Sequence, residues 1–253
     1  MDLTQPRTAL ITGASRGLGY SLARELARRG WSLALMARRR PLLEAAAEEI
    51  RMAGEGKAEV VCEAGDVSDE AARLRLTNRV AERWGHLHLL VNNASELGPT
   101  PLPRLEEFPI DALARLFQAN TVAPLRLVQL SVRLLQAAGQ AMVLNITSDA
   151  AVAGYPGWGG YGASKAALEL ISRALANELA GTGVRVLAVD PGDMDTDMHR
   201  LAVPDADPRK LCSPDQVARR IASLIERYLG ADRSLDAAWR ISLAPPVGGD
   251  ARA

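Results

Sequence analysis

The chain of 253 residues has little cysteine, no excess charge of either sign and no long apolar run. Its two cysteines, Cys62 and Cys212, lack the paired spacing of a zinc site or a disulfide framework, so we expect no metal and a reducing compartment. Thirty basic residues balance thirty acidic ones, which argues against nucleic acid or a membrane surface as a partner. No stretch approaches a membrane span of about 18 apolar residues, and the N-terminal apolar run is too short for a signal peptide. We therefore expect a soluble, cytoplasmic protein.

Short apolar runs alternate with longer amphipathic stretches along the chain. Continuous apolar runs are typical of parallel strands that are buried on both faces. The expected strands cover residues 8–12, 31–37, 58–64, 86–94, 141–147, 184–189 and 239–243. The expected helices cover residues 20–29, 41–53, 68–83 and 214–229, and a further helix contains Tyr161. Residues 110–138 are expected to form one or two long helices. The alternation predicts an α/β fold: a doubly wound parallel sheet with helices on both faces, in one domain over residues 1–253.

Helix ends and two proline-rich segments add detail to this expectation. Gly30 is expected to cap the end of the first helix, and Ser68 the start of the third. Residues 96–109 and 193–213 carry no clear periodicity. They are either plain surface loops or parts of a substrate lid. We favour a lid, with a substrate loop at about 193–213, because both segments follow strand ends, where open α/β sheets bind ligands.

A glycine-rich stretch, Thr12-Gly13-Ala14-Ser15-Arg16-Gly17-Leu18-Gly19, lies between the first expected strand and the first expected helix. Glycines at this place let the backbone turn tightly, let a pyrophosphate approach and let the helix pack closely on the sheet. The helix N-terminus then presents unpaired N–H groups to the phosphates. A glycine triplet alone is weak evidence, but its position between strand and helix strengthens the prediction of a dinucleotide site. No Gly-Lys-Ser or Gly-Lys-Thr follows, so this is not the phosphate loop of an NTPase.

The end of the second expected strand indicates which dinucleotide binds. NAD-binding proteins usually end this strand with an acidic residue that accepts from the ribose 2′-hydroxyl, whereas here it ends Ala37-Arg38-Arg39-Arg40. An arginine fork binds a 2′-phosphate bidentately, and Arg16 can add a second cation to the same pocket. We therefore predict NADP(H) over NAD(H). The alternative is a solvated basic turn, and Arg39 and Arg40 fit that description.

Two further strand ends carry candidate cofactor residues. Asp66-Val67 ends the third expected strand, where a carboxylate and a backbone N–H could bind the edge of an adenine. Asn92-Asn93-Ala94 ends the fourth, where small and amide side chains could border a ribose. Asn and Asp are equally common in turns and caps, so the residues alone leave both interpretations open.

Tyr161 and Lys165 stand four residues apart at the start of a strongly helix-forming run. Positions i and i+4 lie on one face of a helix, so the phenol and the ammonium can share one site. The pKa of a free tyrosine is about 10, and a nearby cation favours the phenolate and lowers that pKa. The pair is therefore a candidate proton-transfer device. Alternatively it is a tyrosine and a lysine on a solvated helix face, and the spacing alone does not decide between the two.

Several short motifs occur in a fixed order over nearly the whole chain. They are TGASRGLG at 12–19, DV at 66–67, NNA at 92–94, Asn120, Ser148, YGASK at 161–165, and PG at 191–192 followed by Thr196. In these motifs the chain resembles the short-chain dehydrogenase/reductase superfamily, in its shorter single-domain branch with a Rossmann fold. The glycine spacing T-G-x-x-x-G-x-G is similar to that branch rather than to the longer, epimerase-like one.

The resemblance implies a catalytic tetrad of Asn120, Ser148, Tyr161 and Lys165. Ser148 would hydrogen-bond the substrate oxygen, and Asn120 would kink its helix and hold a water in a relay through Lys165. Without the resemblance, Ser148 reads as a cap or turn residue and Asn120 as a polar residue of a helix. The implied cofactor residues are Gly13, Ser15, Arg16, Gly17, Leu18, Gly19, Arg38, Asp66, Val67, Asn93, Ala94, Tyr161, Lys165, Pro191, Gly192 and Thr196, with Arg16 and Arg38 at positions that are basic in NADP-preferring members.

The chain departs from the family pattern at two places. The motif NNAG reads Asn92-Asn93-Ala94-Ser95 here, and the serine either narrows the cleft or contacts the substrate. The C-terminal residues only loosely resemble the segment that helps form a tetramer interface in many members, and two prolines are expected to cut the last strand short. A homodimer through the Tyr161 helix and its predecessor, or a homotetramer, is therefore expected.

The function expected from these features is reversible hydride transfer between NADP(H) and a carbonyl or secondary alcohol of a small molecule. The alternative is an NADP-binding regulator or scaffold of the same fold without turnover. Nucleic-acid recognition through the cluster Arg38–Arg40 is weak, because no aromatic residues interleave with it. The substrate is not identified. Side chains expected to border its pocket, or equally to pack within loops, are Leu97, Tyr155, Trp158, Met194, Met198 and His199, with Asp193 and Asp195 as polar candidates.

Overall fold

One parallel sheet of seven strands forms the centre of the protein, in the order β3-β2-β1-β4-β5-β6-β7. The computed structural model describes residues 6–230 and 238–244. Every neighbouring pair of strands is parallel, so the predicted doubly wound sheet is confirmed. The strands are β1 (Thr8–Thr12), β2 (Ser32–Ala37), β3 (Val60–Ala64), β4 (Leu89–Asn92), β5 (Ala141–Ile146), β6 (Val184–Asp190) and β7 (Arg240–Ser242).

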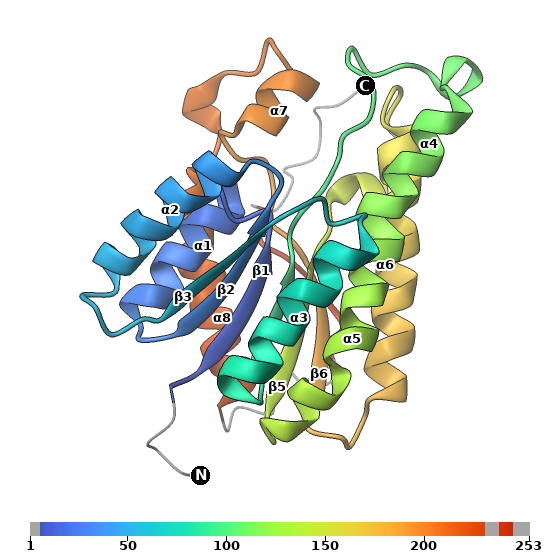
Figure 1. The fold of residues 1–253 in the computed structure, drawn as a ribbon. Helices are drawn as coiled ribbons and strands as arrows, with labels where there is room; N and C mark the ends of the chain where they lie inside the picture. The colour runs from blue at the N-terminus through green and yellow to red at the C-terminus, as the bar shows by residue number, and fades with distance from the viewer. Residues whose placement is uncertain (1–5, 231–237, 245–253) are drawn as a thin grey trace.

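Helices cover both faces of this sheet (Figure 1). On one face α1 (Gly17–Arg28), α2 (Arg40–Ala53) and α8 (Pro214–Leu229) bury one apolar cluster against the strands. On the other face α3 (Glu70–Trp84), α5 (Ala123–Ala137) and α6 (Gly159–Glu178) bury a second. Among the described residues, no helix combines the length and the apolar character that a membrane crossing requires.

The order of the strands reverses between β1 and β4, because β2 and β3 lie on one side of β1 and the later strands on the other. In doubly wound sheets this reversal opens a crevice at the carboxyl ends of the strands, where ligands bind. The glycine-rich stretch leaves β1 at this point and enters α1 directly. Helix α1 therefore begins at Gly17, three residues before the expected start at Tyr20.

Two expected caps differ from the structure. The C-cap of α1 is Arg29, and Gly30 follows it with a φ of 81°, a left-handed conformation that favours glycine. Ser68 does not cap α3, so that prediction is wrong. The N-cap is Asp69, whose carboxylate accepts from the Ala71 N–H at 3.0 Å. Ser68 is drawn into a turn instead, because its N–H donates to the Asp66 carboxylate at 2.8 Å.

The stretch expected as one or two helices over 110–138 is interrupted by a wider turn. Helix α4 (Ile110–Phe117) passes into a π-helical turn, η2 (Gln118–Val122), and then into α5. Single π-turns inside α-helices are frequent at functional sites. This one carries Asn120. The proline-rich segment 193–213 contains a short helix, α7 (Asp197–Ala202), and the segment 96–109 contains the 3₁₀ turn η1 (Leu105–Glu107).

The close packing of the glycine turn predicts a stability effect. A Cβ at Gly19 would collide with the Asn93 side chain and with the Gly13 carbonyl oxygen, which is backbone and cannot move aside. We expect Gly19→Ala to lower the free energy of unfolding by about 1–3 kcal/mol, as overpacking typically does. The matched control is Gly154→Ala, because a Cβ at Gly154 meets nothing within 4 Å. Urea unfolding of both variants measures the difference, and equal midpoints would contradict the expectation.

Candidate active site

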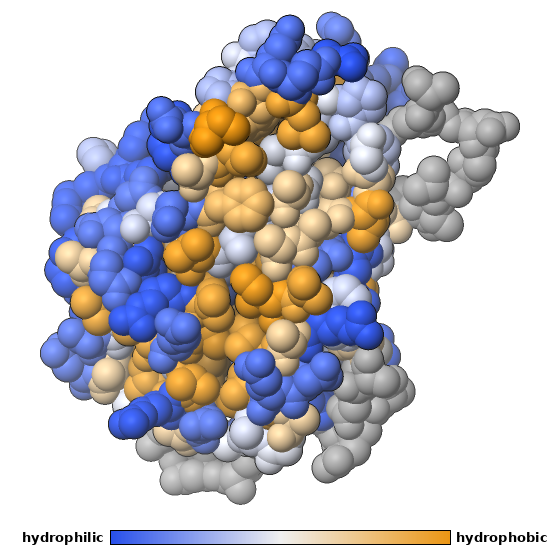
Figure 2. All heavy atoms as spheres, turned by 90° about the vertical axis from the view of Figure 1, so that its right-hand side faces the viewer, coloured by the Kyte–Doolittle hydropathy of each residue, from blue (hydrophilic) through white to orange (hydrophobic). Residues whose placement is uncertain are grey.

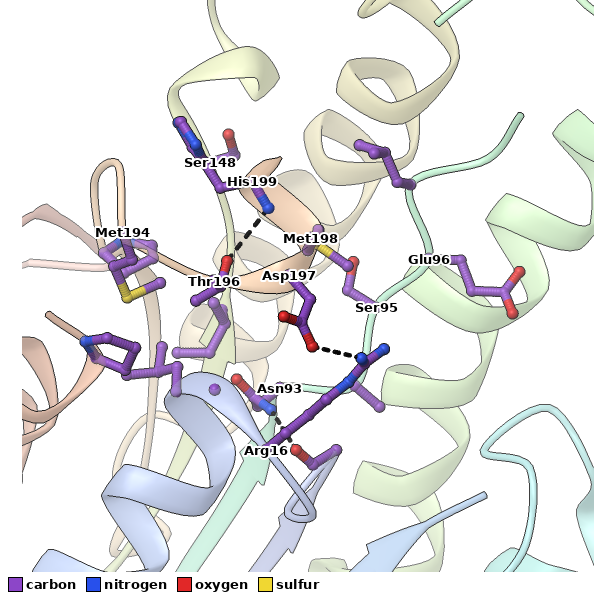
Figure 3. A pocket seen from close by; sticks show the side chains of 18 of the residues that line it. Arg16, Asn93, Ser95, Glu96, Ser148, Met194, Thr196, Asp197, Met198 and His199 are labelled. Carbon is purple, nitrogen blue, oxygen red and sulfur yellow. Dashed lines mark hydrogen bonds and ion pairs between the residues drawn. The ribbon is translucent and has the colours of Figure 1, made fainter. Parts of the chain in front are cut away.

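A cavity of about 920 Å³ opens at the carboxyl ends of the strands, within the range of small-molecule sites. The glycine turn, the residues that follow β2 to β6, and α7 line it (Figure 3). Fifteen of the predicted cofactor residues and the predicted Ser148 border this cavity, namely Gly13, Ser15, Arg16, Gly17, Leu18, Arg38, Asp66, Val67, Asn93, Ala94, Ser148, Tyr161, Lys165, Pro191, Gly192 and Thr196. Gly19 and Asn120 are not among the lining residues.

Tyr161 and Lys165 lie on the buried face of α6, at the wall of the cavity. Their relative exposures are 8% and 2%, so the solvated helix face considered above is excluded. The Lys165 ammonium donates to the carbonyl oxygen of Ile146 at 2.9 Å and lies 5.7 Å from the centre of the Tyr161 ring. The end of β5 thus fixes the lysine beside the phenol, as the i, i+4 spacing predicts.

Burial dominates the ionisation of this pair. Loss of water is the main cause that raises the pKa of Tyr161 to about 12, with the charges of Asp149 and Asp190 adding to it and hydrogen bonds with Ser95 and Ser148 opposing it. The expectation that Lys165 brings the phenol pKa below its ordinary value is therefore wrong in this structure. Burial also lowers the pKa of Lys165 to about 7, because the charged ammonium is poorly solvated there. At neutral pH Tyr161 carries its proton.

Ser148 combines the two roles considered from the sequence. It is the N-cap of the 3₁₀ turn η3 (Asp149–Ala151), and its oxygen accepts from the Ala150 N–H at 3.2 Å. The same hydroxyl also hydrogen-bonds Tyr161 and lies 3.0 Å from the Asp149 carboxylate, to which it donates. A hydroxyl has one proton, so a substrate oxygen in the cavity would compete with Asp149 for it.

Asn120 is fully buried in the π-turn η2, and its amide uses all four hydrogen-bonding positions. Its nitrogen donates to the Glu96 carbonyl at 2.8 Å and to the Ser164 hydroxyl at 3.0 Å. Its oxygen accepts from the Glu96 N–H at 2.8 Å and from the Ser95 hydroxyl at 3.1 Å. Asn120 therefore ties the segment after β4 to α6, next to the pair of Tyr161 and Lys165.

Asn93 fixes the glycine turn against β4. Its amide donates to the Thr12 carbonyl at 2.9 Å, and the Thr12 hydroxyl receives the backbone N–H groups of Asn93 and Ala94. The open position in the turn is Gly17, which has a φ of 57° and whose nearest neighbour for a Cβ is Thr196 at 3.7 Å. Gly17 leaves the backbone accessible from the cavity, which is what the approach of a pyrophosphate requires.

The two arginines predicted to bind a 2′-phosphate both border the cavity, and each already binds a carboxylate. Arg16 reaches Asp197 on α7 at 2.6 Å (Figure 3), and Arg38 reaches Glu96 at 3.0 Å. Their side chains are 55% and 62% exposed, so both guanidinium groups are accessible to a ligand. Arg39 also lines the cavity, whereas Arg40 pairs with Glu44 on its own helix and fits the solvated turn expected for it.

The remaining predicted cofactor residues keep local roles at the cavity wall. The Asp66 carboxylate accepts from the Ser68 N–H in a turn, and Asp66 also borders the cavity. Its role in the turn is therefore compatible with a role in binding a ligand. Gly192 turns with a φ of 74°, and its N–H donates to Asp190 at 3.0 Å. Thr196 is the N-cap of α7 and accepts from the His199 N–H at 3.2 Å (Figure 3).

Apolar side chains gather at the Tyr161 end of the cavity. Tyr161 packs with Leu97, Tyr155, Trp158 and Met198 in one cluster, and the Trp158 ring stands edge-on to the phenol at 5.9 Å. Of the pocket candidates taken from the sequence, only Tyr155 is outside the lining and instead donates its hydroxyl to Asp149 at 3.1 Å. The polar candidates Asp193 and Asp195 also line the cavity.

Three residues at the site were missed or only loosely assigned from the sequence. Ser95 bonds both Asn120 and Tyr161, and only its departure from the family motif signalled it. Asp149 directly follows Ser148 and accepts from its hydroxyl, and no motif in the sequence assigns it a role. Glu96 meets Arg38 across 58 positions of the chain, a distance over which sequence patterns give no signal.

Comparisons with known proteins agree with this geometry. A family model described as short chain dehydrogenase matches residues 7–207. A 1-deoxy-11-beta-hydroxypentalenate dehydrogenase of Streptomyces exfoliatus is 31% identical over 260 residues, 96% of this chain and 92% of that protein. An alcohol dehydrogenase from the archaeon Thermococcus sibiricus, complexed with 5-hydroxy-NADP, superposes with a TM-score of 0.82 and 30% identity over 94% of this chain and 96% of that one.

A xylitol dehydrogenase bound to NAD⁺ superposes with a TM-score of 0.81 and 25% identity over 94% of this chain and 97% of that one. The similar structures thus include complexes with either nicotinamide dinucleotide, and the likeness alone does not choose between them. The matched span, the order of the strands and the glycine turn beside Tyr161 lead to one conclusion: this chain belongs to the short-chain dehydrogenase/reductase family of oxidoreductases.

Proposed function

We propose that the protein catalyses reversible hydride transfer between NADP(H) and a carbonyl or secondary alcohol of a small molecule, with Tyr161 as the general acid/base. The observation that carries this proposal is the buried pair of Tyr161 and Lys165, which shares one cavity with the glycine turn and with Arg16 and Arg38. A proton donor, a phosphate-binding turn and cationic side chains then surround one ligand.

The residues of the cavity have distinct parts in the proposed reduction. A bound nicotinamide dinucleotide supplies the hydride that the carbonyl carbon receives. Tyr161 delivers its phenolic proton to the carbonyl oxygen, and Ser148 donates a hydrogen bond to that oxygen as negative charge develops. Such a donor is typically worth about 3 kcal/mol in the transition state. Lys165 and Asn120 act on Tyr161 by fixing α6 against β5 and against the segment after β4.

The protonation state of Tyr161 sets how the two directions of the reaction depend on pH. Because burial raises the pKa of Tyr161 to about 12, the side chain is a phenol at neutral pH and holds the proton that the reduction consumes. Oxidation of an alcohol needs the phenolate instead. We therefore expect the rate of alcohol oxidation to rise with pH above neutrality while carbonyl reduction does not.

NADP(H) is the proposed dinucleotide because of the cations at the end of β2 and in the glycine turn. Arg38 and Arg16 each bind a carboxylate oxygen at the cavity, and this supports their assignment as partners of an oxyanion. No acidic residue follows β2 to accept from a ribose 2′-hydroxyl, since Ala37 is followed by Arg38 to Arg40. A 2′-phosphate would replace Glu96 and Asp197 as the partners of the two arginines.

A carbonyl panel tests this proposal. Purified protein is mixed with aldehydes, ketones and alcohols, weighted toward apolar and aromatic ones because of the cluster around Trp158, and NADPH absorbance is followed with NADH as the control. We expect oxidation of NADPH with at least one carbonyl of the panel. Tight binding of NADPH without turnover on any of them would favour the alternative, a regulator or scaffold of the same fold.

We also propose a homodimer that forms through α5 and α6. Figure 2 shows a band of apolar residues along the side of the molecule that carries α4, α5 and α6. The helices on this side carry exposed apolar residues, among them Ile110 on α4, Val122 in the turn η2 and Leu170 on α6, which is 68% exposed. An association state of two or four subunits is expected in light scattering. Leu170→Glu should shift it toward the monomer, and an unchanged state would place the interface elsewhere.

A further inference from the structure

The last strand of the sheet brings a partly buried arginine next to segments of the active site. Arg240 opens β7, which pairs with the end of β6 so that Asp190 faces Ser242. The Arg240 side chain is 21% exposed and lies between two acidic side chains, Glu169 at 6% and Asp190 at 4%. Its Nε donates to Glu169 Oε1 at 2.8 Å, and its Nη2 lies 3.7 Å from Asp190 Oδ2.

Each acidic partner accepts a hydrogen bond from a segment that contributes to the active site. Glu169 lies four residues after Lys165 on α6, and its Oε1 also accepts from the Thr147 hydroxyl at 2.8 Å. Thr147 directly precedes Ser148, whose carbonyl oxygen is 3.5 Å from Arg240 Nη2. Asp190 accepts from the Gly192 N–H at 3.0 Å and from the Ser242 hydroxyl at 2.9 Å.

Arg240 thereby joins three parts of the site: the helix of Tyr161 and Lys165, the turn of Ser148, and the turn of Pro191-Gly192. Buried charges are costly unless they are paired, so the guanidinium and its two carboxylates hold each other in one arrangement. The planar fork of arginine reaches several acceptors in fixed directions, which the single point charge of a lysine cannot do.

We propose that Arg240 is a positioning residue, which sets the placement of Ser148 relative to Tyr161 through Glu169 and Thr147, and the placement of the Pro191-Gly192 turn through Asp190. Arg240 is not among the residues that line the cavity, so it acts through these neighbours. The proposal rests on the function proposed above. It assigns a task to the C-terminal strand, which contains no residue of the predicted tetrad.

Arg29 provides a matched control for this test. It also lies between two carboxylates, Glu25 at 2.8 Å and Glu226 at 2.7 Å, and its side chain is 23% exposed. It joins α1 to α8 and is not among the cavity-lining residues. Arg29→Met therefore removes an arginine of similar exposure from between two carboxylates without touching the site, although Glu25 and Glu226 are more exposed than Glu169 and Asp190.

Steady-state kinetics of three variants test the proposal. We expect Arg240→Met to lower kcat about 10²-fold, the cost of misplacing reacting groups by about 1 Å, and to raise KM for NADPH by a smaller factor, because the Pro191-Gly192 turn shifts as well. Arg240→Lys should recover part of the loss, and Arg29→Met should keep the wild-type kcat. A kcat within about twofold of wild type for Arg240→Met, or an equal loss in Arg29→Met, overturns the proposal. If Arg240→Met does not fold, Glu169→Gln and Arg240→Lys decide in the same way, since wild-type kcat in both overturns it.

Hydrogen exchange gives a second measurement that does not require turnover. We expect Arg240→Met to speed amide exchange in peptides covering residues 146–152 and 190–193, and Arg29→Met to leave those peptides unchanged. Unchanged exchange in Arg240→Met overturns the positioning role even if the carbonyl panel gives activity. Wild-type protein that reduces no carbonyl would refute the proposed function instead, and the exchange experiment separates these two failures.

Discussion

Tyr161→Phe is expected to lower kcat for carbonyl reduction by about 10²–10⁴-fold, the usual contribution of a positioned general acid. The change deletes the proton donor and leaves the ring to pack with Leu97 and Trp158. Because the phenol packs among apolar side chains, whereas Arg16 and Arg38 pair with Asp197 and Glu96, the Kd for NADPH should change little.

Steady-state kinetics with the best substrate of the panel measure kcat. NADPH fluorescence measures the Kd for NADPH. Tyr20→Phe is the control, because Tyr20 does not line the cavity and its hydroxyl bonds Glu49 between α1 and α2. Equal turnover of Tyr161→Phe and wild-type protein would remove Tyr161 from the mechanism.

The second large effect concerns the dinucleotide. Arg38→Asp should raise the Kd for NADPH about 10²-fold, because a charge-assisted hydrogen bond of about 1.5–3 kcal/mol is replaced by repulsion of the 2′-phosphate. The same change supplies the missing acceptor for a ribose 2′-hydroxyl, so the Kd for NADH should fall or stay constant. The preference between the two dinucleotides therefore reverses.

Titration of both dinucleotides against the variant measures this reversal. Arg40→Ser is the matched control, since Arg40 belongs to the same run of arginines but pairs with Glu44 and does not line the cavity. A wild-type protein that binds NADPH and NADH equally well, or an Arg38→Asp variant with unchanged preference, would contradict the assigned role of Arg38.

The fold could be predicted from the sequence because its signals are local. Continuous apolar runs marked all seven strands, with ends that differ by at most a few residues, and β1 and α8 match their predicted bounds. The predictions failed where two local signals competed. At the start of α3, the Asp66 carboxylate captured the Ser68 N–H, and Asp69 took the cap.

The sequence predicted which residues form the site, but it did not predict their burial or their pKa values. The spacing of Tyr161 and Lys165 gave their shared face correctly, but it carried no information on burial, which decides the pKa of both. Contacts between distant segments were also beyond prediction, among them Arg38 with Glu96 and Arg240 with Glu169. The prolines predicted to cut the last strand short lie outside the described residues, and a cytoplasmic location stays a prediction.

Isotope transfer tests the central claim most directly. The enzyme is given NADPH that carries deuterium at C4 of the nicotinamide, on the face that the enzyme uses, with an aromatic aldehyde that it reduces, and the alcohol is examined by NMR. The account predicts one deuterium on the carbinol carbon and an ordinary solvent proton on the oxygen. An alcohol without deuterium at that carbon, when the label is offered on either face of the nicotinamide, would contradict hydride transfer in this cavity.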